Sequence, residues 1–293
     1  MKRQKLSGGI SYKTSNLLAR TIITAVLAVI SITMVVPFIW MLSASMKLPL
    51  DVMKLPIDWI PDYLYTKNYE VVWNIGDAAP RDYHFALAYF NSIKLAVINM
   101  VGAVTTSALA GYAFAKIKFR GSSVAFMLYL ATMMIPSQVT LIPKYTLFDK
   151  LGLMGTHWTM ILPGIVSITG TFLMRQYFMQ IPDELRESAF IDGANELRIW
   201  GQIMIPIAKP AMASLAMIVF LWSWNNYMDA LVFLRNWRLY TIPVSLTNFV
   251  EESTTEYSLI MAASASALLP VFAVFLAGQK FFVKGLAAGA VKG

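Results

Sequence analysis

The densest group of polar side chains within an apolar stretch lies at residues 220–229, Phe-Leu-Trp-Ser-Trp-Asn-Asn-Tyr-Met-Asp. An amide in a membrane helix needs a partner, so Asn225 is expected to face a helix bundle or a wet cavity. Aromatic faces beside amides, as at Trp224 and Asn225, suit a sugar, which presents an apolar C–H face and a rim of hydroxyl groups. An aromatic belt at the outer membrane interface, with Asn225 in an interhelical hydrogen bond, fits these residues at least as well.

A second polar segment, residues 181–210, lies between apolar runs and has the pattern of helix, sharp turn and helix. Pro182 can open a helix, because its missing N–H is not needed there, and the acids after it suit the positive end of the helix. Gly193 can turn with positive φ, and the second helical pattern runs from Asn195 until Pro206 stops it. The sequence therefore predicts a polar helix-turn-helix at the foot of a membrane bundle.

Patterns for catalysis and metal binding are missing from the sequence. There is no cysteine, which excludes disulfides and thiolate metal sites. His84 and His157 lie far apart in predicted external loops and are interpreted as solvated surface residues, not metal ligands. No Gly-x-x-x-x-Gly-Lys-Ser/Thr loop, Gly-x-Ser-x-Gly elbow or dinucleotide-binding fingerprint occurs. We therefore predict a chain that is not an enzyme, holds no metal or cofactor, and does not itself hydrolyse ATP.

Composition assigns the chain to the membrane. Its apolar fraction is 57% and its charged fraction 14%, against about 45–50% and about 25% in soluble domains. A helix needs about 20 apolar residues to cross a hydrocarbon layer of about 30 Å. Six runs are long enough: about 17–46, 86–115, 122–143, 156–179, 207–234 and 257–283. The first is too long for a signal peptide and is predicted to be a retained helix. We predict an all-α integral membrane protein with about six transmembrane helices.

The distribution of charge predicts the orientation of these helices. With the N-terminus inside, the inner segments hold 15 of the 24 basic residues and five acids, a net charge of +10. The outer segments hold nine basic and 11 acidic residues, a net charge of −2. Cytoplasmic loops carry the excess of lysine and arginine, so both termini are predicted to be cytoplasmic. The basic charge is interpreted as facing anionic lipid, and nucleic-acid binding is not expected.

Two connecting segments have features that affect the fold. Prolines and aromatic residues in the external loop 47–85 predict a compact, partly ordered loop that either covers a pore mouth, touches an external partner or packs on the helix ends. In 133–156, Pro136 and Pro143 are each expected to disturb a helix. Gln138 lies between them and is expected either to line a cavity or to satisfy the freed backbone groups.

Small residues in the second apolar run predict that helices approach closely there. They recur every four positions, as Gly102, Thr106 and Ala110, with Ala103, Ser107 and Gly111 beside them.

Residues Glu187-Ser-Ala-Phe-Ile-Asp-Gly193-Ala, followed by Ile203, Ile205-Pro206 and Pro210, resemble the EAA motif of ABC-importer permeases. The segment departs from that motif at Ser188, where alanine is usual, and at Ile205, where leucine is usual. Five further stretches make the chain similar to the maltose-type carbohydrate permeases, and among these to the shorter partner of the permease pair: Tyr112–Gly121, Met134–Pro143, Leu151-Gly-Leu153, Trp224-Asn225 and Gly285–Gly293. The resemblance covers about residues 17–293.

The resemblance implies one permease domain over 1–293. Within it we expect a first helix at about 17–46, a core at about 86–283, a coupling-helix loop at 181–206 and a small, flexible C-terminal tail at 284–293, which reaches toward an ATPase interface. In such importers the loop docks in a cleft of a separate ATPase subunit. The implied ATPase-coupling residues are Glu187, Ser188, Ala189, Asp192, Gly193 and Pro206. The candidate substrate path consists of Gln138, Trp224 and Asn225.

Contacts of the coupling helix can also be predicted. Leu185, Ala189 and Phe190 offer apolar contact to the ATPase. Asp183 and Glu187, four residues apart, repel each other on an isolated helix, which fits a basic partner surface. A solvated acidic face is the other interpretation of these two residues.

The predicted function is that of a permease subunit in an ATP-driven, binding-protein-dependent importer of a sugar or oligosaccharide. The implied partners are a second permease, two ATPase subunits that hold ATP and Mg, an external substrate-binding protein and membrane lipid. The implied location is the bacterial cytoplasmic (inner) membrane, in several passes. Two alternatives remain: a secondary transporter or channel that needs no ATPase, and an ABC importer for a glycerophosphodiester or polyol.

Overall fold

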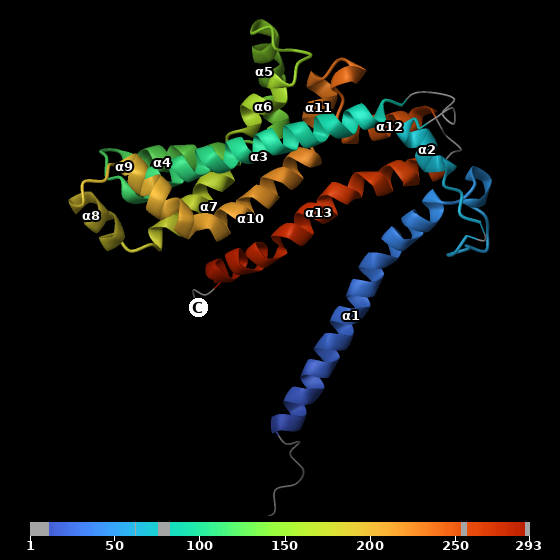
Figure 1. Ribbon diagram of the computed structural model, residues 1–293, viewed down its shortest axis with the longest axis horizontal. Helices are drawn as coiled ribbons and strands as arrows, with labels where there is room; N and C mark the ends of the chain where they lie inside the picture. The colour runs from blue at the N-terminus through green and yellow to red at the C-terminus, as the bar shows by residue number, and fades with distance from the viewer. Residues whose placement is uncertain (1–11, 62, 76–82, 253–256, 291–293) are drawn as a thin grey trace, which may run out of the picture.

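A computed structural model describes residues 12–61, 63–75, 83–252 and 257–290 (Figure 1). This part of the chain contains helices and loops and no strand, which confirms the all-α prediction. The α-helices are α1 (Tyr12–Ser45), α2 (Lys67–Trp73), α3 (Phe85–Lys116), α4 (Ser122–Ala131), α5 (Ser137–Lys150), α6 (Trp158–Gly164), α7 (Ile168–Met179), α8 (Glu184–Ile191), α9 (Glu196–Ile199), α10 (Ile205–Trp224), α11 (Met228–Phe233), α12 (Ile242–Glu252) and α13 (Tyr257–Ala290). Short 3₁₀ turns are η1 (Pro49–Asp51), η3 (Thr132–Met134) and η5 (Trp237–Leu239), and η4 (Trp200–Met204) is a π-helical turn.

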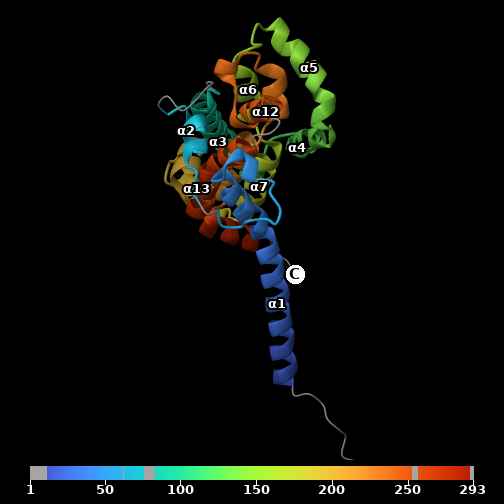
Figure 2. The same ribbon diagram turned by 90° about the vertical axis from the view of Figure 1, so that its right-hand side faces the viewer.

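Helix α3 is the central element of the bundle. It packs against α7 and α10, and α10 in turn packs against α13. Figure 1 shows α8 and α9 at one end of this elongated body and α2 and α12 at the other, while α5 and α6 project from its side. Helix α1 meets α13 only near the α2 end and then diverges from the bundle, as Figures 1 and 2 both show.

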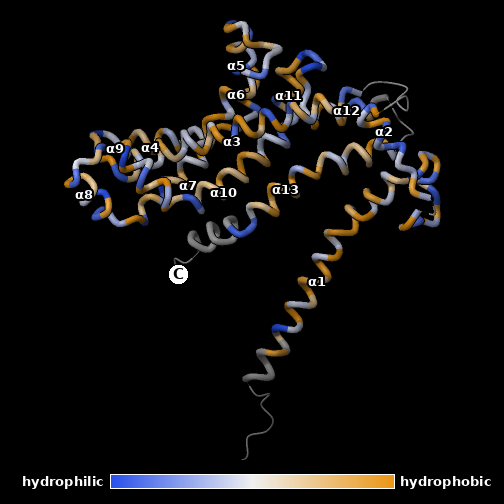
Figure 3. The backbone as a smooth tube through the Cα atoms, in the orientation of Figure 1, coloured by the Kyte–Doolittle hydropathy of each residue, from blue (hydrophilic) through white to orange (hydrophobic). Residues whose placement is uncertain are grey.

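Four described helices are long and apolar enough to cross a membrane: Ala19–Ser45, Phe85–Lys116, Glu196–Trp224 and Tyr257–Lys280. The number rises to five if Ser122–Met134 and Ser137–Lys150, which are bent by 99°, form one span. The tube in Figure 3 shows the apolar residues along α1 and α13. The predicted runs 122–143 and 156–179 are thus interrupted helices, the second divided between α6 and α7.

The break between α6 and α7 is covered by the small residues of α3. Thr106 Oγ1 donates a hydrogen bond to the Ile165 carbonyl at 2.6 Å, so a carbonyl freed by the break has a partner. A Cβ added to Gly102 would lie 2.4 Å from Ile165 Cγ2. A Cβ added to Gly111 would lie 2.7 Å from Met174 Cβ. The close helix packing predicted from the small-residue spacing is therefore confirmed for these two glycines.

The buried amide nitrogens of Asn91 and Asn99 in α3 donate to residues that follow much later in the chain. Asn91 Nδ2 donates to the carbonyls of Arg238 and Tyr240, at 3.0 and 3.1 Å. Asn99 Nδ2 donates to Ser223 Oγ at 2.9 Å. Polar groups within the bundle thus fasten α3 to α10 and to the turn before α12.

Pro136, Pro143 and Pro206 were each expected to disturb or stop a helix, but only Pro136 lies at a break. Pro136 lies at the sharp bend, as expected, but α5 continues through Pro143. Pro206 does not stop the second helix of the 181–210 segment, because one helical stretch runs from Glu196 to Trp224. In η4 the Ile205 N–H bonds to the Trp200 carbonyl five residues back. The next residue is Pro206, which has no N–H to place, so the helix continues.

The structure differs from the sequence predictions at the ends of α10 and α13, and it shows how part of the loop 47–85 is packed. Helix α10 ends at Trp224 and not near 234, and α13 continues to Ala290, into the segment predicted as a flexible tail. In the loop predicted to be external, Trp73 packs its ring on Phe85 and Tyr89, with centroids 5.2 and 5.0 Å apart. This part of the loop packs on helix ends, whereas residues 62 and 76–82 lie outside the described chain.

The prediction of two solvated histidines is wrong. His84 stacks on Trp237 with ring centroids 3.6 Å apart, and His157 Nε2 lies 3.0 Å from the Leu239 carbonyl oxygen. Both are half-buried, because the η5 segment folds back over them. Neither belongs to a metal-binding group, since the described residues contain no cluster of three or more potential ligands.

Candidate functional site

The polar segment 181–206 forms the predicted helix-turn-helix. Helix α8 begins after Asp183 and ends at Ile191. Gly193 has a φ of +78°, which L-residues with side chains rarely adopt. The turn is closed by hydrogen bonds from Gly193 N to the Phe190 carbonyl and from Ala194 N to the Ala189 carbonyl, at 3.1 and 3.0 Å. These bonds satisfy carbonyls at the end of α8, so the turn is fixed by backbone geometry.

One face of helix α8 is buried against the rest of the chain, and the other face is exposed. Ala189 is 9% exposed and packs in a core cluster with Phe178 and Ile199. It therefore cannot offer apolar contact to another protein, and that part of the sequence prediction is wrong. Glu187 and Ser188 are exposed, and Ser188 Oγ donates to the Glu184 carbonyl of its own helix at 2.6 Å.

The exposed face of α8 is more apolar than the sequence analysis recognised. Leu185 and Phe190 are 43% and 58% exposed, as a contact surface requires. Ile191 is 86% exposed and was missed, although an isoleucine directly before an acid and a glycine is unusual for a solvated turn. Asp192 and Gly193, also exposed, follow it at once. Apolar side chains bordered by acids therefore cover the tip of this segment, at one end of the bundle (Figure 1).

Asp183, directly before α8, is exposed but already has a partner within this chain. Asp183 Oδ1 accepts a hydrogen bond from Lys116 Nζ at 2.5 Å, and this lysine holds the pKa of the Asp183 carboxyl below its usual range. Asp183 is thus paired within its own chain, which corrects the expectation that it meets a basic partner surface together with Glu187. Arg186 pairs in the same way with Glu196.

Three residues of this network were missed by the sequence analysis: Tyr112, Lys116 and Glu196. Tyr112 and Lys116 lie one helical turn apart at the end of α3. A tyrosine and a lysine four residues apart at the end of an apolar helix are a visible signal. Their partners, however, lie 84 and 67 residues away, which no local pattern reveals.

Pro206 is separated from the rest of the predicted coupling residues. It is exposed at the start of α10, beyond α9 and η4. The structure therefore brings together Glu187, Ser188, Asp192 and Gly193 on the outside of one short segment. Pro206 contributes to helix geometry elsewhere.

The predicted substrate-path residues are placed differently from one another. Trp224 is 3% exposed, stacks on Phe220 at 5.7 Å between centroids and meets Tyr89 edge-on. It is a packing residue within this chain. Asn225 is exposed, and its Nδ2 donates to the Leu221 carbonyl of its own helix at 2.8 Å, so the interhelical hydrogen bond considered for it is not formed.

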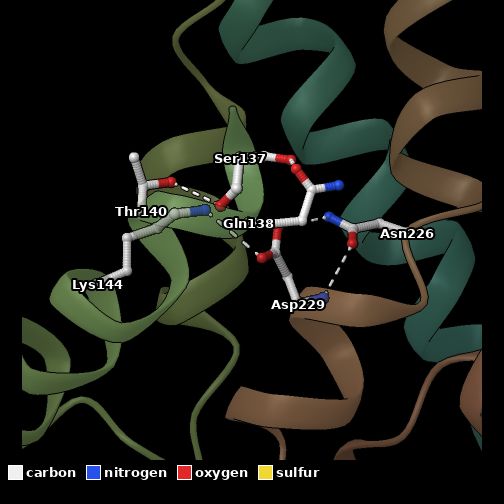
Figure 4. A network of polar contacts seen from close by, with 6 residues as sticks. All are labelled: Ser137, Gln138, Thr140, Lys144, Asn226 and Asp229. Carbon is white, nitrogen blue, oxygen red and sulfur yellow. Dashed lines mark hydrogen bonds and ion pairs between the residues drawn. The ribbon is translucent and has the colours of Figure 1, made fainter. Parts of the chain in front are cut away.

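Gln138 is exposed at the start of α5 and accepts a hydrogen bond from Ser137 Oγ at 3.4 Å. This contact is with a side chain and does not satisfy backbone freed by the prolines. Figure 4 shows Gln138 in the region where α5 and the turn between α10 and α11 are joined. The join consists of Lys144 Nζ and Asp229 Oδ1, 3.5 Å apart, and of Asn226 Nδ2, which donates to Asp229 Oδ2 at 3.1 Å.

Asn226 and Asp229 belong to the polar run 220–229, but the sequence analysis selected their neighbours Trp224 and Asn225. The arrangement offers amide, carboxylate and ammonium groups at one place outside the packed core. Such groups can hydrogen-bond a hydroxyl-rich solute. That this run lies on the substrate path stays a prediction; within it Trp224 is buried, whereas Asn225 is exposed.

The chain is similar to proteins of known families over most of its length. The family model described as "Binding-protein-dependent transport system inner membrane component" matches residues 103–287. The "Arabinooligosaccharides transport system permease protein AraQ" of Bacillus subtilis (strain 168) is 32% identical over 276 residues, which covers 94% of this chain and 96% of that protein. The "sn-glycerol-3-phosphate transport system permease protein UgpE" of Yersinia enterocolitica is 33% identical over 241 residues, covering 80% of this chain and 84% of that protein.

One solved structure has a closely similar fold. It is described as the "Crystal structure of a bacterial ABC transporter involved in the import of the acidic polysaccharide alginate". The match has a TM-score of 0.80 at 24% sequence identity and covers 94% of this chain and 100% of that chain. At this identity the likeness establishes the fold.

Proposed function

This chain belongs to the family of inner membrane components of binding-protein-dependent transport systems, and we propose that it imports a sugar or oligosaccharide as one permease of an ATP-driven complex. The observation that carries the proposal is the match of the family model over residues 103–287, which includes the whole 181–206 segment. The exposed tip of that segment supports the proposal, because it has the properties of a docking surface.

ATP hydrolysis in this proposal takes place on two separate ATPase subunits, which hold the ATP and Mg. Leu185, Phe190 and Ile191 would enter a cleft in one of them, and each such side chain contributes about 1.5–3 kcal/mol when it is fully buried. Glu187 and Asp192 at the border would meet basic groups of the cleft and fix the orientation. A second permease and an external substrate-binding protein complete the complex in the cytoplasmic membrane.

The first test is a charge reversal at Glu187. In a complex reconstituted in liposomes, Glu187→Lys should leave the protein in the membrane but separate ATP hydrolysis from uptake, with uptake per ATP reduced about tenfold or more. The measurement is radiolabelled sugar accumulated per phosphate released. Asp149→Lys is the matched control, because it makes the same charge change at an exposed position of α5, away from the docking surface. Normal coupling in Glu187→Lys contradicts the docking assignment.

A second substrate class is supported by one observation. The similarity to a permease named for sn-glycerol-3-phosphate, at 33% identity, supports a phosphorylated glycerol, a class related to the glycerophosphodiester or polyol alternative. Calorimetry on the external substrate-binding protein with an oligosaccharide and with a glycerophosphodiester decides between the two. Uptake into liposomes by this chain alone, without ATP, would instead indicate a secondary transporter or channel.

A further inference from the structure

The end of α3 holds the coupling segment 181–206 by three contacts in one row. They start from Ala108, Tyr112 and Lys116, which are four residues apart and therefore lie on one face of the helix. The Ala108 carbonyl accepts a hydrogen bond from Trp200 Nε1 at 3.3 Å. Each contact involves a different part of the segment. Lys116 binds its beginning at Asp183, Tyr112 binds its middle at Glu196, and Ala108 binds the η4 turn at Trp200.

Lys116 fixes the start of α8. Its side chain is 4% exposed, and Nζ donates to Asp183 Oδ1 and to the Ile181 carbonyl, each at 2.5 Å. A buried ammonium is costly unless it is paired and hydrogen-bonded, so loss of either partner disfavours this arrangement strongly. The lysine also lies in the last turn of α3, where a positive charge is favoured by the helix dipole.

Tyr112 fixes the turn between α8 and α9 through Glu196. The buried tyrosine hydroxyl donates to Glu196 Oε2 at 2.6 Å. Arg186 of α8 donates to both oxygens of the same carboxylate, through Nη2 to Oε1 and through Nε to Oε2. A bidentate arginine–carboxylate pair is geometrically specific, so Glu196 sets the angle between α8, α9 and α3.

We propose that Tyr112 and Lys116 are positioning residues that fasten the coupling segment to α3, so that a displacement of α8 carries α3 with it. The inference rests on the proposed function, because only a docked ATPase would displace α8. Helix α3 packs on α7 and α10, so a motion delivered to α3 reaches the centre of the bundle. Without the polar row, α8 is joined to that centre by the flanking chain and by apolar contacts, which constrain its angle less.

The functional test compares Lys116→Met and Tyr112→Phe with Lys118→Met in reconstituted complexes. Lys118 is the next lysine along the chain and makes no hydrogen bond or ion pair to the segment. Both positioning variants should still bind the ATPase subunit, because the docking surface is intact, and uptake per ATP hydrolysed should fall about two- to thirtyfold. Lys116→Arg, which keeps the positive charge and the N–H donors for Asp183 and the Ile181 carbonyl, should retain much of the coupling. Unchanged coupling in both single variants overturns the inference.

A distance measurement reports on the fastening directly. Since the chain has no cysteine, spin labels can be placed at Arg120→Cys and Glu184→Cys without background labelling. In the wild-type background the distribution of label distances should be narrow and should stay the same when ATP is trapped. Lys116→Met should broaden it, and Lys118→Met should not. A wild-type distance that changes with ATP, or equal widths in the two variants, overturns the inference.

The two proposals fail in distinguishable ways. If the wild-type chain binds no ATPase subunit, the proposed function fails, and the label distances still report whether α8 and α3 are fastened. If the ATPase binds and uptake is coupled, but the positioning variants behave as wild type, only the fastening is wrong.

Discussion

Gly193 and Ala189 show that neighbouring residues of the coupling segment have separate tasks. Ala189 anchors α8 in the core, while Gly193 allows the chain to reverse with a φ of +78°. No atom lies within 4 Å of the position that a Cβ at Gly193 would occupy. Any effect of a side chain there therefore comes from backbone strain and not from crowding.

This separation predicts the result of Gly193→Ala. A left-handed conformation costs a residue with a Cβ about 1–2 kcal/mol, so the turn should open more often. Trypsin cleavage at Arg186 and Arg198, which flank the turn, should be about 5 to 30 times faster in the purified protein. Gly201→Ala is the matched control, since its Cβ also meets nothing but its φ is not positive. Equal cleavage rates in the two variants would show that the turn is not strained.

Helix α3 combines close packing on α7 with polar contacts at its end, and Gly111 lies where both meet. A Cβ at Gly111 would lie 2.8 Å from the Arg175 backbone nitrogen as well as against Met174. A backbone atom cannot rotate away, so Gly111→Ala must separate the two helices. We expect a loss of about 1–3 kcal/mol of stability, measured as a lower Tm by circular dichroism in detergent. Gly201→Ala should not lower the Tm, since a Cβ there meets nothing and alanine favours the helix; an unchanged Tm for Gly111→Ala contradicts the packing.

At the scale of helices and turns, the sequence predicts those features that depend on residues close together in the chain. The apolar runs, the turn at Gly193 and the bend at Pro136 follow from composition and from backbone chemistry. Pro206 was mispredicted because a π-helical turn absorbs its missing N–H, and such a turn depends on neighbouring helices as well as on local propensity. Ala189 was mispredicted because the side of α8 that is buried depends on α7 and α9, whose Phe178 and Ile199 share its core cluster.

The candidate site was predicted less fully for the same reason. Glu187, Ser188, Asp192 and Gly193 could be grouped from the sequence because they lie within seven residues of one another, and their role in coupling stays a prediction. Lys116 and Tyr112 act on residues 67 and 84 positions away, so only the folded chain joins them to the site.

For the whole molecule, the uneven distribution of charge predicts a single orientation. Basic residues gather on the α8 end, and Arg198 is exposed there. Lys54 is exposed in the external loop. In intact cells, Lys54→Cys should therefore react with a membrane-impermeant maleimide, and Arg198→Cys should react only after lysis. The reverse pattern would place both termini outside. Since the chain has no cysteine, each variant reports one position.

The hydrogen bonds of α3 also have a consequence for synthesis at the ribosome. Asn99 pairs with Ser223, which is 124 residues further along the chain. At about 5–20 residues per second, the ribosome needs about 6–25 s to supply that partner. Helix α1 has less of such a requirement, because no residue in the most apolar part of its span is buried within the chain. Helix α1 can thus settle in the bilayer as soon as it emerges, whereas α3 must keep a polar amide in a water-lined or proteinaceous environment until α10 arrives.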